Sequence, residues 1–434
     1  MAIRRGGLSR GQWLIACLLI SGLAVALSGC AGLRSANAFR PLATHPRSID
    51  SREGTRVDDV TVVSARTVWI AITGSEQLNR HINCLRGHTR AACLEGNIAV
   101  FRTDDGGVHW RRRLLIRGST RHPPQGVPFA GLKFFRGGAG LVLITFDEAG
   151  RPVLLRTSDG GGSWQRSPFL SSSAFGNGYD LDFVDAKHGW VIADRSAATG
   201  MEWLSLYRTV DGGRTWEKIA GTGHAGQVSS IPAYGDKNFL TFRSPTTGWL
   251  AGSDNSGVAE LYLSRDGGRH WRLQRLPSLP GQTPRSPVTK VAYAPEFYSR
   301  RSGVEPVAAY FPNGSGGRWK VFLYSTVDGG LHWVRPRPLP FARVDVFEIR
   351  DAGHWWLGAG TTIWRSQDMG HTWRAAALPI RGDALLSSLW FVDDRVGLAV
   401  ERYQMGGWDN EALFRSVDGG KRWQAVAVPR SVGS

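Results

Sequence analysis

Short apolar stretches separated by polar turns fill the chain from about residue 57 to residue 430 and predict strands throughout. Most stretches have about the four to eight residues of a strand, and no helical period of useful length appears after residue 35. Many come in pairs, in which a short polar turn and then Gly or an aromatic residue separate two apolar stretches. The copies lie at 60–72, 132–144, 181–193, 240–252, 297–310, 346–358 and 389–400.

A second pattern follows each of these pairs. Its clearest copy, residues 207–216, reads Y-R-T-V-D-G-G-R-T-W and predicts a tight turn between two strands. Glycine adopts backbone angles that other residues resist, and the Asp carboxylate can accept hydrogen bonds from the N–H groups of its own turn. The seven copies are centred on Asp105, Asp159, Asp211, Asp266, Asp328, Asp368 and Asp418, and the sixth has Met369 in place of the first Gly.

One apolar pair and one such turn together make two hairpins, or four strands, and the chain contains seven of these units. Four-stranded sheets repeated around an axis are a known way to protect strand edges. We therefore predict an all-β fold, a single seven-bladed β-propeller of four-stranded antiparallel blades over residues 57–430. The repeats override the two or three domains that 434 residues would otherwise suggest. Residues 431–434 form a short C-terminal tail.

The N-terminus has the features of an export signal. Arg4, Arg5 and Arg10 precede an apolar run from Trp13 to Leu27, which is too short for a confident membrane span. The run ends in Leu27-Ser28-Gly29-Cys30, which resembles the bacterial lipobox. That resemblance implies that residues 1–29 are a lipoprotein signal peptide and that Cys30 carries a lipid anchoring the protein to a membrane. An ordinary secretory signal with an incidental cysteine is the alternative. Residues 30–56 then form a tether, and residues 36–56 are candidates for a closing strand.

Two cysteines remain for the folded domain, Cys84 and Cys93, and we expect them to form a disulfide because the chain is exported. A metal site with the nearby His81 and His88 is the alternative. These residues lack the C-x-x-C spacing of zinc sites, so no metal and no cofactor is expected.

The formal net charge of +17 suggests acidic partners, namely anionic lipid head groups, acidic glycans or acidic protein surfaces. Nucleic acid is not expected as a partner of an exported protein. A solvated surface whose arginines reflect genomic base composition is the alternative explanation of the charge.

The turns resemble the Asp-box, S/T-x-D-x-G-x-T/H-W, of sialidase-type propellers, and we call them Asp-box turns. The D-G-G form, together with a G-W pair in copies such as residues 181–193, is most similar to the photosystem II stability and assembly factor family and its bacterial relatives. The resemblance extends over residues 57–430. It implies a seven-bladed, exported and non-enzymatic protein, but it transfers no partner, because many relatives occur in organisms without photosynthesis.

A glycoside hydrolase of sialidase type is the alternative function. Sialidases need an arginine trio, a Tyr–Glu nucleophile pair and an acid Asp in addition to their Asp-boxes. The F/Y-R-I-P motif that carries the first of those arginines is absent, and the nearest match, Phe39-Arg40-Pro41, lies in the tether. We therefore assign no catalytic residue and interpret the seven Asp residues as structural.

Topology predicts the binding face. Turns 1–2 and 3–4 of each blade lie on one face of a propeller, so the 2–3 connections and the links between blades lie on the other. Long loops are expected there at 74–98, 194–203 and 401–412, and loops on a rigid scaffold commonly bind ligands. A protein or glycan ligand is expected on this face, with the candidate contacts Arg80, His81, Arg86, Arg121, Arg195, Arg402 and Trp408. Each of these could equally be an ordinary loop residue.

Overall fold

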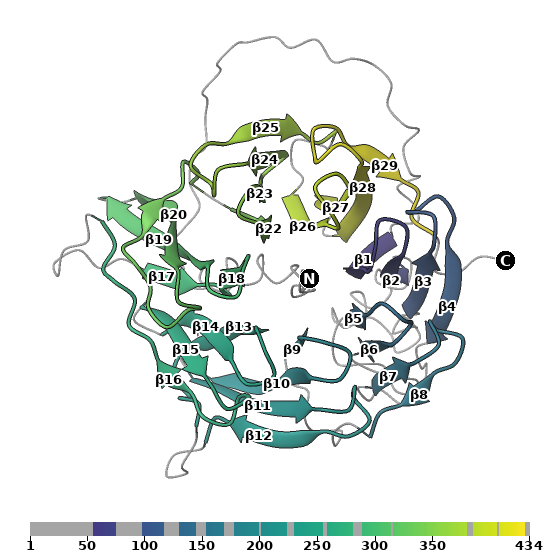
Figure 1. Cartoon of the computed structure of the whole chain (residues 1–434), viewed down its shortest axis with the longest axis horizontal. Helices are drawn as coiled ribbons and strands as arrows, with labels where there is room; N and C mark the ends of the chain where they lie inside the picture. Colours follow the sequence, from purple (N-terminus) through teal and green to yellow (C-terminus); the bar gives the residue numbers. More distant parts are fainter. Residues whose placement is uncertain are drawn as a thin grey trace, which may run out of the picture.

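A computed structural model describes thirteen segments of the chain: 55–74, 98–116, 130–144, 153–168, 178–198, 201–223, 230–254, 258–280, 289–313, 316–342, 344–379, 385–405 and 408–429. These segments contain twenty-nine β-strands and no helix. The strands form seven antiparallel sheets arranged in a ring (Figure 1), so the predicted seven-bladed β-propeller is confirmed. The first strand begins at Thr55, two residues before the expected boundary.

Each blade is built from strands that are consecutive in the sequence. Blades 1 to 3 contain β1 (Thr55–Val62), β2 (Val68–Gly74), β3 (Ile98–Thr103) and β4 (Arg111–Ile116); β5 (Ala130–Phe134), β6 (Gly140–Ile144), β7 (Val153–Thr157) and β8 (Gln165–Arg166); and β9 (Gly178–Phe183), β10 (Gly189–Ala198), β11 (Met201–Thr209) and β12 (Glu217–Gly221). Blades 4 and 5 contain β13 (Asp236–Phe242), β14 (Gly248–Ser253), β15 (Ala259–Ser264) and β16 (Arg272–Leu273); and β17 (Thr289–Ala292), β18 (Glu296–Phe297), β19 (Gly303–Asn313), β20 (Gly316–Thr326) and β21 (Arg337–Pro338). Blades 6 and 7 contain β22 (Val346–Asp351), β23 (His354–Ala359), β24 (Thr362–Ser366) and β25 (Arg374–Ala377); and β26 (Leu385–Phe391), β27 (Gly397–Met405), β28 (Trp408–Ser416) and β29 (Gln424–Val426).

Blade 5 has a fifth strand because its innermost strand is broken. Both β17 and β18 pair with β19, and residues 293–295 between them stand opposite only Glu305 and Pro306. Proline has no N–H to give to a ladder and is confined to edges and bulges. Pro306 therefore explains why the inner strand bulges at this point.

The ring closes through side chains. Blade 7 packs on blade 1 through an apolar cluster that includes Val57, Ile70 and Leu398, and the Trp110 indole donates to the Ala427 carbonyl at 3.1 Å. No described strand is shared between these two blades. Residues 36–54, which would supply most of the predicted closing strand, lie outside the described segments.

The phenylalanine that ends strand 1 explains the recurrent Gly at the start of strand 2. In blade 3, Phe183 ends strand 1 and lies opposite Gly189, where an added Cβ would come within 2.3 Å of the ring. The same cross-strand pair recurs in four other blades, as Phe134–Gly140, Phe242–Gly248, Phe297–Gly303 and Phe391–Gly397. Blades 1 and 6 have Val62–Val68 and Ile349–Trp355 instead. The glycine is therefore present only where a phenylalanine covers it.

The Trp that follows this position joins neighbouring blades. Trp190 of blade 3 stacks on Phe242 of blade 4 with ring centroids 3.6 Å apart, and its indole donates to the Gly267 carbonyl at 2.8 Å. Trp69 and Trp356 stack on Phe134 and Phe391 of the next blade in the same way. Stacked rings of this kind add about 0.5–1.5 kcal/mol to the burial of their area.

Candidate functional site

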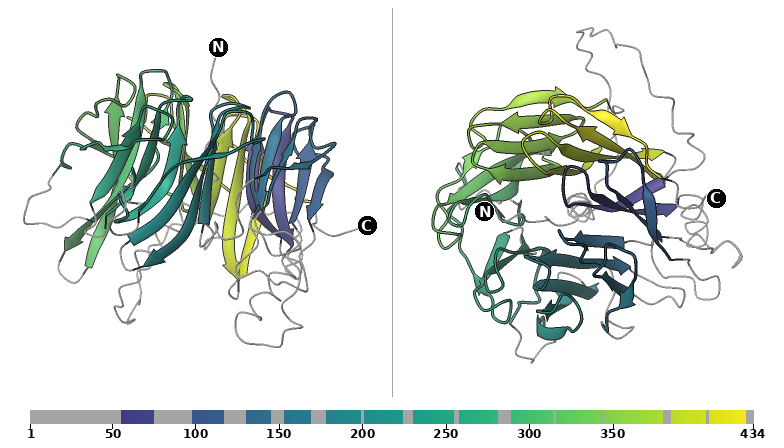
Figure 2. Two further views of the ribbon diagram at one scale, coloured as in Figure 1. Left: turned by 90° about the horizontal axis from the view of Figure 1, so that it is seen from below. Right: turned by 45° about the vertical axis from the view of Figure 1, so that its right-hand side comes forward.

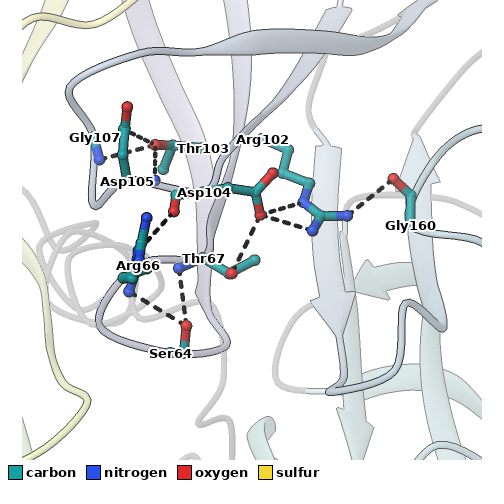
Figure 3. Close-up of polar contacts among 9 residues, drawn as sticks. All are labelled: Ser64, Arg66, Thr67, Arg102, Thr103, Asp104, Asp105, Gly107 and Gly160. Atoms are coloured by element: carbon teal, nitrogen blue, oxygen red, sulfur yellow. Dashed lines mark hydrogen bonds and ion pairs between the residues drawn. The ribbon is translucent and has the colours of Figure 1, made fainter.

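Every Asp-box turn lies between the third and fourth strands of its blade, so all seven are on one face of the ring, which we call the Asp-box face. Blade 1 shows the arrangement (Figure 3). Asp105 Oδ1 accepts from the N–H groups of Val108 at 3.0 Å and His109 at 2.9 Å. It also accepts from the Thr103 hydroxyl at 2.8 Å. The Thr103 oxygen in turn accepts from Gly107 N–H at 2.9 Å. The turn is thus closed by its own side chains.

The other six turns repeat this network. In each, a Ser or Thr hydroxyl two residues earlier donates to the carboxylate, as in Asp159, Asp211 and Asp266, and in the turns of Asp328, Asp368 and Asp418. The bonds from the His109 N–H and side chain hold the pKa of Asp105 well below its usual range. At Asp211 partial burial opposes this shift, but hydrogen bonds from Thr215 and others outweigh it and lower the pKa. These carboxylates are ionised and already accept hydrogen bonds from their own turns, which suits a structural role and not the role of a proton donor.

Arginines on the same face connect several blades to the next. Arg102 binds Asp104 of its own turn at 2.7 Å and reaches the Gly160 carbonyl of blade 2 at 3.5 Å. Arg208 donates to the Pro245 carbonyl of blade 4 at 3.1 Å, and Arg365 to the Gly419 carbonyl of blade 7 at 3.2 Å. These three arginines occupy the same place in the repeat, three positions before the central Asp of the Asp-box turn.

Blades 4 and 5 lack this arginine, because Leu263 and Ser325 stand in its place. Other arginines of the same blades make the equivalent contacts. Arg243, from the 1–2 turn of blade 4, donates to the Gly329 carbonyl at 2.9 Å, and Arg337, from β21, donates to the Gly370 carbonyl at 2.6 Å. Part of the basic charge therefore has a structural use, which no sequence pattern had indicated.

The opposite face carries three long hairpins, and we call it the hairpin face. They are β10–β11, β19–β20 and β27–β28, each a 2–3 connection (Figure 2). The expectation of loops at 194–203 and 401–412 was wrong, since most of those residues continue the strands. Beyond Arg402 the hairpin β27–β28 is a two-stranded ribbon, because the pairing with β26 ends at Leu385–Arg402.

The structure places three of the predicted contacts on these hairpins. Arg195 lies in β10, Arg402 in β27 and Trp408 in β28, where Trp408 pairs with Met405 near the tip. Arg80, His81, Arg86 and Arg121 lie outside the described residues, as do the expected disulfide Cys84–Cys93 and the expected lipid site Cys30. The binding role of all these residues stays a prediction.

Apart from Trp408, the aromatic residues described on the hairpin face were not predicted. Tyr234 is 66% exposed in the link that leads into blade 4. On β19–β20, Tyr310 lies opposite Trp319 with ring centroids 5.4 Å apart. The spacing of 62 residues between Asp266 and Asp328, the widest between consecutive Asp-box turns, was the signal for extra length in that blade.

A buried polar cluster supports this part of the face. The Lys237 ammonium lies 3.1 Å from Glu260 Oε2, and Tyr262 donates to Glu260 Oε1 at 2.8 Å. Glu202 of blade 3 accepts from the Lys237 N–H at 2.7 Å, which joins the two blades beneath the link. Paired and hydrogen-bonded groups of this kind fix the geometry of the surface above them.

The described segments contain no group of three or more His, Cys, Asp or Glu residues placed to hold a metal ion. Within the same segments no helix is long and apolar enough to cross a bilayer.

Two photosystem II assembly factors are similar to this chain in sequence. The photosystem II assembly lipoprotein Ycf48 of Synechococcus sp. (strain CC9902) is 23% identical over 354 residues, covering 80% of this chain and 89% of that protein. The chain resembles the photosystem II assembly factors. The stability/assembly factor HCF136 of Arabidopsis thaliana, a chloroplast protein, is also 23% identical, over 63% of this chain and 62% of its own length.

Structural comparison finds YCF48 bound to a D1 peptide, with 15% identity and a TM-score of 0.46, covering 84% of this chain and 94% of that chain. No family model matches the chain.

Proposed function

We propose that this protein is an exported, lipid-anchored propeller that acts as a non-catalytic assembly scaffold at the cell envelope. The observation that carries the proposal is the similarity to an assembly lipoprotein over 80% of the chain. The closed Asp-box turns support it, because their carboxylates are all engaged in holding the fold. The partner is a protein that docks on the hairpin face, where the exposed Tyr234 and the Tyr310–Trp319 pair provide aromatic contact area.

The scaffold is tested against the sialidase-type hydrolase by a screen with fluorogenic glycosides, sialosides included, together with a crosslinking pull-down from the native membrane. We expect no turnover above a buffer control and recovery of a defined protein partner. Turnover that survives purification to homogeneity would favour the hydrolase.

The anchor is tested at Cys30, with Cys17 as the matched control because it lies in the apolar run that would be removed. Cys30→Ala should release the protein from the membrane fraction or block its processing, and Cys17→Ala should do neither. An unchanged membrane distribution of Cys30→Ala would contradict lipid anchoring.

The disulfide between Cys84 and Cys93 would hold the segment 74–98 in one arrangement and so lower the ordering cost of partner binding. Mass spectrometry of the exported protein should show this bridge. A Cys84→Ser, Cys93→Ser double variant should keep its thermal midpoint within a few degrees and bind its partner more weakly. Two free thiols would overturn the disulfide, and unchanged affinity would overturn its role in binding.

A further inference from the structure

A cleft of about 440 Å³ opens on the Asp-box face between blades 6 and 7. Trp355 and Trp356 form part of its lining, together with four cationic side chains: Arg365, Arg374, Arg395 and Lys421. Arg395 belongs to the 1–2 turn of blade 7 and Lys421 to the Asp-box turn of the same blade. The cleft is therefore on the side of the molecule away from the hairpins.

The local rules of the repeat change in blade 6, beside this cleft. In the other six blades a glycine N–H of the Asp-box turn donates to a carbonyl of the 1–2 turn, as Gly419 does to Arg395 at 2.8 Å. Blade 6 shows no such bond among its described residues; Met369 replaces that glycine with φ 56°, and β22 and β23 pair as far as Asp351–His354. Departures from a repeat pattern are expected at functional positions.

Two arginines stand directly opposite each other in this blade. Arg365 of β24 pairs with Arg374 of β25, and like charges in that position are destabilising. Blades 2, 3 and 7 place Gln165, Glu217 and Gln424 opposite their arginine. Blade 1 also has two arginines, Arg102 and Arg111, but Asp104 binds Arg102 at 2.7 Å. In blade 6 the position of Asp104 is held by Gln367, so the pair lacks a counter-charge.

The acidic residues of the cleft are already engaged. Asp418 accepts from its own turn, including the Lys421 N–H at 3.0 Å, and Asp394 lies 3.8 Å from Arg350. Arg374, Arg395 and Lys421 form no ion pair with any described residue. The cleft therefore presents unneutralised positive charge and the hydrogen-bond donors of arginine to whatever enters it.

We propose that this cleft binds an anionic saccharide, with a carboxylate or sulfate group of the sugar between Arg365 and Arg374. Most peptide recognition relies on pockets for apolar side chains or on an added strand, and arginine clusters recognise peptides only through acidic or phosphorylated motifs. Here the two Trp side chains are only 1% and 2% exposed, so the accessible lining is polar and charged. Guanidinium and amide groups such as Gln367 suit sugar hydroxyl and acid groups.

The test is calorimetric titration of the exported protein with four probes: a sulfated hexasaccharide, an oligogalacturonate, neutral maltohexaose and a short poly-glutamate peptide. The cleft variant is Arg374→Gln with Lys421→Gln. The control is Arg272→Gln with Arg214→Gln, which removes the same charge at the equivalent positions of blades 4 and 3, where Arg272 faces the uncharged Leu263. Circular dichroism melting verifies that both variants fold.

We expect an acidic saccharide to bind, the cleft variant to weaken it at least about tenfold, and the control to stay within about twofold. Maltohexaose should not bind. Equal weakening in both variants would mean diffuse attraction to a basic protein and would overturn the site. Binding of neither acidic saccharide, or tighter binding of the glutamate peptide to the same arginines, would overturn the saccharide.

Discussion

Glu305 is an acidic residue at a position of strand 2 where each of the other six blades has a buried apolar residue. Its equivalents in strand 2 are Ile70, Val142, Val191, Leu250, Leu357 and Ala399, all fully buried like Glu305 itself. Both carboxyl oxygens of Glu305 lack a hydrogen-bond partner among the described residues. Burial, and then the charge of Glu296, raise its pKa well above the usual value, so the group is held as a neutral acid.

Because the pKa of Glu305 is raised in the folded protein, the stability of the fold is predicted to fall as pH rises. Below pH 4.5 the carboxyl is neutral in both the folded and the unfolded chain. As pH rises from there towards the folded-state pKa, only the unfolded chain releases its proton, so the free energy of unfolding falls by up to about 1.4 kcal/mol per pH unit. Glu305→Gln removes this loss, and its advantage in thermal midpoint over the native protein should grow between pH 5 and pH 7. A constant difference across that range would contradict the buried neutral acid.

The Asp-box carboxylates are predicted to stabilise and not to bind. Asp211→Ala removes the acceptor for the Arg214 and Thr215 N–H groups and the Thr209 hydroxyl. Because the site is partly exposed, we expect a loss near the lower end for charged hydrogen bonds, about 1.5 kcal/mol, with partner binding intact. The adjacent exposed Val210→Ala should be nearly neutral. If Asp211→Ala abolished binding without lowering the thermal midpoint, the structural role would be wrong.

Sequence reasoning was sufficient for residues whose role is contained in a local motif. The Asp-box turns follow from the spacing of Ser/Thr, Asp, Gly and Trp, and the structure shows their bonds. Arg243 and Arg337 could not be found in this way, because they replace a motif arginine from other positions in the blade. In the sequence, Glu305 cannot be told from an ordinary polar residue. It is recognised only when the equivalent positions of the seven blades are compared in the structure.

Where strands extend beyond the rest of their blade, they lose the alternation of apolar and polar residues by which a strand is predicted. Ser196, Ala197 and Ala198 pair only with β11, and Tyr403 to Met405 only with β28. No neighbouring strand or blade requires an apolar alternation there, so polar residues are tolerated and the sequence resembles a loop. Two of the three hairpins of the hairpin face, β10–β11 and β27–β28, were for this reason predicted in place but not in form.

The Phe–Gly pair is the element-scale feature that can be tested most directly. Gly189→Val should be destabilising by about 1–3 kcal/mol, because its side chain would overlap the Phe183 ring. Phe183→Val should also be destabilising. The double variant recreates the Val62–Val68 pair of blade 1, so it should lose less than the sum by about 1 kcal/mol or more in chemical denaturation. Additive losses would show that the ring does not dictate the glycine.

At the scale of the whole molecule, the ring has two different faces. On the Asp-box face, arginine and Trp side chains of several blades reach the next blade. The opposite face carries the long hairpins, the exposed Tyr234 and the Tyr310–Trp319 pair. The repeat count and the assignment of faces were predictable from sequence, because topology alone determines them. The cleft between blades 6 and 7 was not, because it depends on how two turns pack in space.

Site-specific photo-crosslinking tests the assembly-scaffold account most directly. A photo-reactive amino acid is placed at Tyr234 on the hairpin face or at Val327 on the Asp-box face, which are 66% and 71% exposed, in the anchored protein in its native membrane. The account predicts that Tyr234 yields a discrete protein adduct, identifiable by mass spectrometry, and that Val327 yields none. Protein adducts at Val327 with none at Tyr234 would contradict it.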